Sequence, residues 1–360
     1  MDDWYIDPDI RRAFTLPAAF YADPDNYARS AERIFSHTWH YVADGEVVRQ
    51  PGDVYPFTLL PEMLAEPLVL VKDDNDQVRC LSNVCTHRAK VVVERPGNVR
   101  QLRCRYHGRC FALDGAFKNM PAFEGAEDFP SRRDDLSAVP SFSWLGMWFV
   151  GLAPWVSFAD MVTPIQERVG FLPLDTLTFV PEASRTFEVK AHWALYCENY
   201  LEGLHIPFVH PALNKALEFP EYEYELFDWC SLQLGVAKEG EPCFDLPEGH
   251  PDQGKRVYAW YFFVFPTLMF NFYPWGLSLN VVEPRGPAHC RVHFRTYRFA
   301  EAPFNREEFA LEQTEMEDEA VVESVQLGIR SRYYHRGRYS PTMEQAVHHF
   351  HRLISNCMQE

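Results

Sequence analysis

Residues 85–107 read CTHRAKVVVERPGNVRQLRCRYH, and each end of this stretch carries a cysteine and a histidine. The first arm has the spacing C-x-H and the second C-x-x-H, with sixteen residues between His87 and Cys104. Two thiolates and two imidazoles at such spacing suit either Zn²⁺ or an iron–sulfur cluster. The stretch therefore predicts a metal centre held by Cys85, His87, Cys104 and His107.

The composition of the two arms favours the cluster over zinc. Zinc sites built from paired arms more often use C-x-x-C, whereas a Rieske [2Fe–2S] centre takes two thiolates on one iron and two imidazoles on the other. Gly108 follows the second histidine and allows the backbone to approach the cluster closely. The prediction is a Rieske [2Fe–2S] centre, with structural zinc as the alternative.

The segments around the two arms predict an α+β protein with three parts. Between residues 40 and 155, short apolar runs alternate with turn signals such as DDND and RPGN, which is typical of a β domain. Residues 1–39 contain a segment with helical spacing. Residues 156–360 combine a strand-rich block with a helical C-terminal part. We expect residues 1–39 and 156–360 to form one catalytic domain and residues 40–155 to form the cluster domain.

Composition excludes several classes of protein. The formal net charge of −17, without a block of Lys or Arg, argues against a nucleic-acid partner. Residues 257–282 contain no charged residue, but prolines and asparagines interrupt them, so buried strands are expected rather than a membrane span. Nine scattered cysteines do not resemble a disulfide framework, and no basic-then-apolar signal opens the chain. A cytoplasmic protein is expected.

A second candidate site lies in residues 198–211, ENYLEGLHIPFVHP. Five positions along a regular helix rotate a side chain by about 140°, so His205 and His210 would not converge on one point. Pro207 should kink or end the helix between them and so allow convergence. Two histidines with one carboxylate form the facial triad that binds Fe(II) and leaves open positions for O₂. The nearby candidate for the carboxylate is Glu202.

A distant candidate for the carboxylate is Asp318. In the acidic segment EMEDEAVVES (315–324), Asp318 shares a helical stripe with Val322 and Val325, whereas Glu319 lies among polar neighbours. An aspartate on the apolar stripe points inward, and a buried carboxylate needs a partner. A metal ion would supply that partner, although an Arg or Lys would also do so.

Together the two sites resemble the α subunits of Rieske non-haem iron oxygenases, the ring-hydroxylating oxygenase family. The resemblance spans nearly the whole chain, from FTLPAAFYADPDNYARSAERIFSHTWHYV (14–42) through both sites to the C-terminal helices. It implies an antiparallel helix-grip (START-like) catalytic domain beside or around the Rieske domain. It also implies His205, His210 and Asp318 as ligands of a mononuclear iron, with Asn199 beside the iron. Glu202 would bridge one subunit's cluster histidine to the next subunit's iron site.

The resemblance further implies the electron source and the reaction. No G-x-G-x-x-G occurs, so NAD(P)H electrons would arrive through a separate flavin/iron–sulfur reductase. Transfer between neighbouring subunits implies an α3 trimer. The enzyme would use O₂ as a monooxygenase or dioxygenase, to hydroxylate or oxidatively dealkylate a small molecule. The alternative from another class is a Rieske electron-transfer protein without oxygenation.

Three positions depart from the family pattern. Ala89 stands where a glycine usually follows His-Arg, Arg109 stands where an aromatic residue usually follows His-Gly, and Leu204 stands where a tyrosine often precedes the first iron histidine. None of these positions is a ligand. The turn around Ala89 must therefore form without glycine.

The resemblance is strongest to the branch that oxidises quaternary ammonium compounds such as choline, betaines and carnitine. It rests on Glu202 and on the segments FNFYPWGLSLNVVEP (270–284) and GRYSPTMEQAVHHFHRLI (337–354). Aromatic rings bind such cations through their faces, and we expect Trp260, Phe263 and Tyr273 to line the substrate pocket. Alternate strand positions face opposite sides, so at most half of the aromatic residues can do so. An aromatic or other flat substrate is the alternative.

Overall fold

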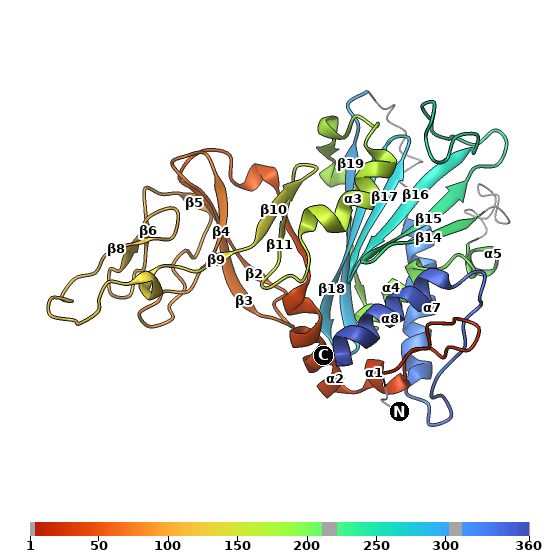
Figure 1. The fold of residues 1–360 in the computed structure, drawn as a ribbon, viewed down its shortest axis with the longest axis horizontal. Helices are drawn as coiled ribbons and strands as arrows, with labels where there is room; N and C mark the ends of the chain where they lie inside the picture. Colours follow the sequence, from red (N-terminus) through yellow and green to blue (C-terminus); the bar gives the residue numbers. More distant parts are fainter. Residues whose placement is uncertain (1–3, 211–221, 302–311, 360) are drawn as a thin grey trace. The chain divides into compact units, whose positions relative to one another are not determined.

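The structure is a computed structural model that describes residues 4–210, 222–301 and 312–359 (Figure 1). The chain divides into two compact units. One unit is continuous and contains residues 36–155, whereas the other combines residues 1–35 with residues 156–360. The continuous unit contains the cysteine–histidine arms, and the discontinuous unit contains His205, His210 and Asp318.

The unit of residues 36–155 is built from short antiparallel strands. They form a five-stranded sheet in the order β5-β2-β3-β4-β9 and two three-stranded sheets in the orders β1-β11-β10 and β6-β7-β8. The strands are β1 (His40–Asp44), β2 (Asp53–Leu59), β3 (Glu66–Lys72), β4 (Val78–Ser82), β5 (Gly97–Asn98), β6 (Leu102–Arg103), β7 (Cys110–Phe111), β8 (Phe117–Asn119), β9 (Ala138–Val139), β10 (Ser141–Trp144) and β11 (Met147–Val150).

The core of this unit reaches the two arms directly. Val69, Val71 and Leu81 are fully buried, and they pack in one cluster with Cys85 and Cys104. Burial of these apolar side chains stabilises the unit and also holds the first residue of each arm in place. Each arm is thus a loop whose cysteine end is anchored in the core.

The unit of residues 1–35 and 156–360 contains a long antiparallel sheet and most of the helices (Figure 1). The sheet runs in the order β12-β19-β18-β17-β16-β15-β14, and β13 also pairs with β19. Its strands are β12 (Thr178–Phe179), β13 (Arg185–Val189), β14 (Glu223–Leu226), β15 (Cys230–Val236), β16 (Val257–Val264), β17 (Leu268–Tyr273), β18 (Gly276–Gly286) and β19 (His289–Arg298). The helices are α1 (Ala18–Ala22), α2 (Pro24–Arg33), α3 (Phe158–Val169), α4 (Trp193–Tyr200), α5 (Ile206–Val209), α7 (Glu312–Ile329) and α8 (Gln345–Gln359).

The two faces of this sheet have different partners. Tyr200, at the end of α4, donates a hydrogen bond from its hydroxyl to Oδ1 of Asn271 on β17, and Phe263 on β16 packs edge-on against Phe350 of α8. The opposite face of β16 presents Trp260, whose ring lies against Phe171 after α3. Helices α4 and α8 therefore cover one face and the α3 region covers the other. This is the predicted α+β helix-grip arrangement.

The uncharged segment 257–282 forms buried strands, as predicted. It contains β16, β17 and most of β18, and its apolar residues pack into the sheet core. In the described part of the chain, no helix has both the length and the apolar character needed to cross a bilayer. None of the nine cysteines, all of which lie in the described part of the chain, forms a disulfide.

Candidate functional site

The two cysteine–histidine arms fold into loops of the same kind. In the first, the backbone N–H of Cys85 donates to the carbonyl of Lys90 (2.9 Å), and the N–H of Ala89 donates to the carbonyl of Cys85 (2.9 Å). In the second, Cys104 pairs in the same way with Arg109 (2.8 Å) and Gly108 (3.1 Å). Each cysteine is thus followed, four and five residues later, by the residues that close its loop.

The fourth position after each cysteine adopts a left-handed backbone. Gly108 has φ of +77° and Ala89 has φ of +52°. Glycine adopts this conformation freely, whereas a side chain with Cβ is strained in it. The first turn therefore forms without glycine, as expected, but alanine retains the left-handed geometry that the loop requires.

The four predicted cluster ligands lie together. Nδ1 of His87 and Nδ1 of His107 are 3.1 Å apart. Two nitrogen ligands about 2.1 Å from one metal ion lie roughly 3.0–3.4 Å apart for angles between about 90° and 110° at the metal. The Cys85 and Cys104 thiols contact each other, and burial together with this neighbour raises the pKa of Cys85. A metal centre would compensate for the buried thiolates, so the donor set fits a [2Fe–2S] cluster.

The histidine side of the arms is the more open side. Cys85 and Cys104 are buried, whereas His87 is half-buried and His107 is exposed. Tyr106 stacks on His107 with ring centroids 3.7 Å apart. Burial lowers the pKa of His87, and the charges of His107, Arg88 and Arg109 lower it further. The imidazole is thus favoured in the neutral form that binds metal.

His205 and His210 lie at the two ends of the short helix α5. Helix α4 is capped by His192 and ends at Tyr200, a short turn follows, and α5 begins after His205. Pro207 lies in the first turn of α5, where its missing N–H costs no helical hydrogen bond. The helical break lies at residues 201–205, before His205, so the prediction of a break at Pro207 between the two histidines was wrong. The two imidazole centroids are 5.0 Å apart.

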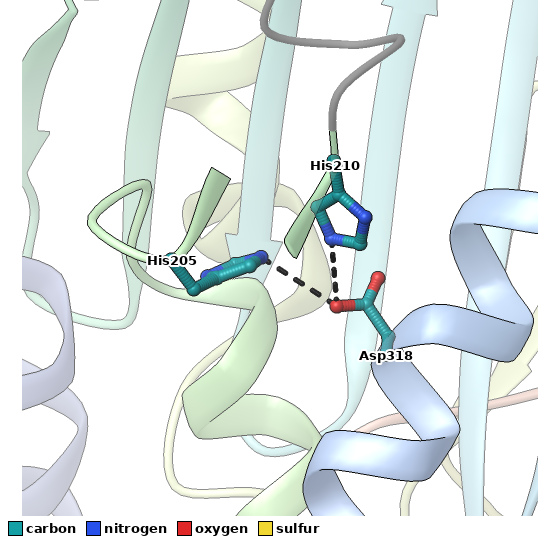
Figure 2. A group of neighbouring side chains, drawn as sticks. All are labelled: His205, His210 and Asp318. Atoms are coloured by element: carbon teal, nitrogen blue, oxygen red, sulfur yellow. Dashed lines mark hydrogen bonds and ion pairs between the residues drawn. The ribbon is translucent and has the colours of Figure 1, made fainter. Parts of the chain in front are cut away.

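Asp318 on α7 completes the group (Figure 2). One carboxylate oxygen, Oδ1, lies 2.9 Å from Nε2 of His210 and 3.5 Å from Nε2 of His205. One ligand atom from each of the three residues lies within 4.8 Å of the others. Figure 2 shows both rings directed at this carboxylate. The structure therefore brings together the two-histidine, one-carboxylate set predicted as an iron site.

Two further carboxylates lie on the outer nitrogens of these rings. Nδ1 of His205 is 2.6 Å from Oε1 of Glu202, and Nδ1 of His210 is 2.8 Å from Oε2 of Glu317. A ligand histidine commonly donates its second ring N–H to a carboxylate, which fixes the tautomer and the ring orientation. Glu202 is thus separated from the metal position by the His205 ring. Sequence reasoning missed Glu317, because a run of acids does not reveal which of them faces a ring.

Asn199 lies beside Asp318 and His205. Its side-chain Nδ2 donates to Oδ1 of Asp318 (2.7 Å) and is 3.4 Å from Nε2 of His205. It therefore orients the carboxylate from α4, the same helix that leads to His205. Burial alone would lower the pKa of His210, but Asp318 and Glu317 raise it overall. This surplus of negative charge suits a divalent cation.

The face of α7 differs in part from the predicted stripe. Val322 is buried and Asp318 is half-buried, as expected, but Val325 is 43% exposed and the buried position next to it is Gln326. Glu319, which we placed among polar neighbours, has a buried Oε1, and burial raises the pKa of its carboxyl. The inward face is therefore rotated by about one position from the stripe inferred from spacing.

The register of the sheet separates the three predicted pocket residues. Phe263 and Tyr273 lie on the face that α4 covers, but Trp260 points to the other face. Trp260 is fully buried, and its Nε1–H donates to Oδ2 of Asp252 (2.9 Å). Including Trp260 in the pocket was wrong, because residues three apart on one strand lie on opposite faces.

Tyrosines gather on the face that α4 covers. Tyr261 and Tyr273 have ring centroids 6.0 Å apart, and Tyr273 stacks on Trp275. Tyr200 lies over the same strands through its bond to Asn271. Tyr222 donates to Gln233 (3.3 Å) on β15, and its ring lies directly beside Gly203 of the turn before His205. Alternation along β16 could have pointed to Tyr261, because it shares the parity of Phe263.

Comparison with known families covers both units. Residues 38–130 match the Rieske [2Fe-2S] domain family, and residues 176–360 match the family described as ring hydroxylating alpha subunit (catalytic domain). The second match alone covers just over half of the chain.

Similar proteins include both enzymes and solved structures. A chloroplastic choline monooxygenase of Arabidopsis thaliana is 29% identical, over 97% of this chain and 84% of the plant enzyme. The carnitine monooxygenase oxygenase subunit of Escherichia coli K12 is 26% identical, over 97% and 95% of the two chains. The quaternary ammonium Rieske monooxygenase CntA has a similar fold, with a TM-score of 0.77, 23% identity and coverage of 98% and 97%. The chain thus belongs to the ring-hydroxylating α-subunit family and is a Rieske non-haem iron oxygenase with a [2Fe–2S] cluster and a mononuclear iron.

Proposed function

We propose that this oxygenase hydroxylates or oxidatively dealkylates a quaternary ammonium compound. The observation that carries the proposal is the cluster of phenol rings on the sheet face beside the His205 turn. Choline and carnitine monooxygenases are among the similar proteins, and CntA has been solved with L-carnitine and with gamma-butyrobetaine. In all these compounds the group that distinguishes the substrate is a trimethylammonium cation.

The phenol rings supply the chemistry that such a cation needs. A quaternary ammonium group cannot donate a hydrogen bond, so its recognition depends on ring faces and on nearby negative charge. Tyr261 and Tyr273 offer ring faces, and burial raises the pKa of both, so they remain neutral phenols. Tyr222, whose pKa burial also raises, extends this aromatic surface toward Glu202. We place the cation among Tyr222, Tyr261 and Tyr273, with Phe263 behind them.

We assign the mononuclear iron to Nε2 of His205, Nε2 of His210 and the carboxylate of Asp318. An iron held by these residues would supply the activation of O₂. The residues of this chain orient the ligands. Asn199 holds the Asp318 carboxylate, and Glu202 and Glu317 hold the two rings with Nε2 directed inward. Removing one of these partners would misdirect a ligand without removing it.

We assign the electron route to the cluster arms and to Glu202. Cys85, His87, Cys104 and His107 would hold the cluster, with the imidazoles on the open side. Glu202 contacts both the ring and the backbone N–H of His205, so it is placed to connect an incoming imidazole with the iron site. This route requires a neighbouring subunit, and we propose an α3 trimer that receives electrons from a separate NAD(P)H-dependent reductase. The lack of disulfides among the nine cysteines supports a reducing compartment such as the cytoplasm.

The substrate proposal is tested by coupled turnover. The purified enzyme, supplied with a reductase and NADH, is incubated with choline, glycine betaine, L-carnitine or gamma-butyrobetaine, and with naphthalene as the flat aromatic alternative. NADH oxidation, O₂ uptake and the organic product are measured together, because one turnover of a monooxygenase consumes one NADH and one O₂ and forms one product. Stimulation by a trimethylammonium compound with matched product supports the proposal. Product from naphthalene alone would refute it, and O₂-independent electron transfer alone would support the non-oxygenating alternative.

A matched pair of variants tests the cage. Tyr273→Leu should raise KM for the trimethylammonium substrate about tenfold or more, because one cation–ring contact is lost. Trp260→Phe, on the opposite face of the sheet, should leave that KM unchanged. Equal effects of the two substitutions on KM would contradict the placement of the cation.

A further inference from the structure

The residues at the fifth position after the two cluster cysteines are equivalent in backbone but opposite in environment. Lys90 and Arg109 each accept a hydrogen bond from their loop's cysteine N–H through the backbone carbonyl. The side chain of Lys90 is one-third exposed and pairs with the solvent-facing Glu94. The side chain of Arg109 is only 3% exposed. The second arm therefore carries a buried positive charge where the first carries a solvated one.

The surroundings of Arg109 are mostly aromatic. Its guanidinium carbon lies 4.9 Å from the ring centroid of Phe117 and 5.5 Å from that of Phe129. Its Nη2 donates to Asp134, and its Nε is buried without a hydrogen-bond partner among the described residues. In such a low-dielectric place the field of a charge is screened far less than at the surface.

Asp134 connects this charge to the first arm. Its backbone carbonyl accepts a hydrogen bond from Oγ1 of Thr86 (2.8 Å), the residue between Cys85 and His87. Burial alone would raise the pKa of Asp134, but the Ser131 N–H and Arg109 lower it overall, so the carboxylate is ionised. The Arg109–Asp134 pair therefore connects the two arms. Arg109 belongs to the second arm, and Asp134 binds Thr86 of the first arm.

We propose that the buried positive charge of Arg109 raises the reduction potential of the cluster. The proposal rests on the cluster ligands assigned above. A reduced cluster carries one more negative charge than an oxidised one, so a fixed cation nearby favours reduction, and net charge is among the factors that set such potentials. Arg109 follows His107 by two residues, and its carbonyl binds the N–H of Cys104. The carboxylate of Asp134, which accepts from the terminal Nη2 of Arg109, opposes this effect of the positive charge on the potential.

The potential distinguishes this electrostatic role from a purely structural one. Arg109→Gln, Asp134→Asn and Lys90→Gln are prepared in the full-length, cluster-loaded protein, and midpoint potentials are measured by redox titration followed by EPR. Arg109→Gln should shift the potential downward and Asp134→Asn upward, because the two substitutions remove charges of opposite sign. Lys90→Gln, which removes an exposed charge from the equivalent position, should shift it least. The Arg109→Gln shift should persist at high salt, because a buried charge is poorly screened.

The outcomes separate this proposal from the cluster assignment. Shifts of the same sign in Arg109→Gln and Asp134→Asn, or no shift in either with an intact Rieske EPR spectrum, would overturn the proposal. If Arg109→Gln does not retain a cluster, Asp134→Asn decides by the sign of its shift. A wild-type protein without a Rieske spectrum would instead refute the four cluster ligands.

Discussion

Ala89→Gly should stabilise the cluster unit, although it removes a methyl group. Ala89 has φ of +52°, a backbone conformation that costs an L-residue roughly 1–2 kcal/mol. Glycine avoids this cost but loses roughly 0.5–1 kcal/mol through the greater entropy of the unfolded chain. The net gain is about 0.5–1 kcal/mol. For a unit the size of residues 36–155, this corresponds to roughly 2–4 °C in melting temperature.

The equivalent position of the second arm offers the reverse experiment. Gly108→Ala should destabilise the same unit by about the same free energy, because φ of +77° is unfavourable for alanine. No clash adds to this cost, since a Cβ at Gly108 would lie 3.7 Å from its nearest neighbour, Cγ of Pro121. Gly97→Ala is the control, because Gly97 has open space around its Cβ position and no positive φ. It should raise the melting temperature, because alanine reduces the entropy of the unfolded chain there without backbone strain, so its shift should be opposite in sign to that of Gly108→Ala.

The assay follows thermal unfolding through the visible circular dichroism of the cluster, which reports on this unit alone. All variants are heated at one scan rate, because loss of the cluster makes unfolding irreversible and the apparent melting temperature rate-dependent. A lower melting temperature for Ala89→Gly, or a higher one for Gly108→Ala, would refute the argument that the two loops share one left-handed position.

The other predictions concern the unit that contains the iron ligands. Asp318→Ala should abolish mononuclear iron but leave the cluster EPR spectrum intact, and metal analysis that finds one such iron per chain would contradict the ligand assignment. Glu202→Gln should retain both metal centres but slow substrate-triggered oxidation of the reduced cluster about 10–100-fold in stopped-flow measurements; an unchanged rate would exclude Glu202 from the route. Trp260→Phe should lower the free energy of unfolding, measured with urea, by about 1–3 kcal/mol, because the buried Asp252 carboxylate loses a hydrogen-bond donor. A loss below about 0.5 kcal/mol, which is typical of surface substitutions, would contradict this. Burial alone would raise the pKa of Asp252, but Arg168 and Trp260 lower it overall. The ionised Asp252 should therefore contribute fully to stability above about pH 4, and this contribution should decline as the pH falls toward the folded-state pKa. Arg168→Met should therefore make stability less steeply dependent on pH below about pH 4, which acid titration followed by far-UV circular dichroism measures.

Much of the two sites could be predicted because their signals are local. The arms are short loops, and their cysteine–histidine spacing indicated the donor types before any fold was known. By contrast, the helical break predicted at Pro207 was misplaced: it lies at residues 201–205, before His205, and Pro207 is tolerated in the first turn of α5. Turn signals and uncharged runs indicated the β domain and the buried strands, because alternation and punctuation are properties of the chain itself.

The sequence by itself determined which donors are available and which of them are held close together along the chain. Tertiary structure decided which distant groups meet them: the rotation of α7 directs Asp318 and Glu317 to the two rings, and the register of β16 and β17 removes Trp260 from the substrate face. It also decided that Arg109 is buried against Asp134 while Lys90 remains in solvent. The physical reason is that spacing along a chain sets local geometry, whereas the direction in which a helix or strand presents its side chains depends on what the whole unit packs against it.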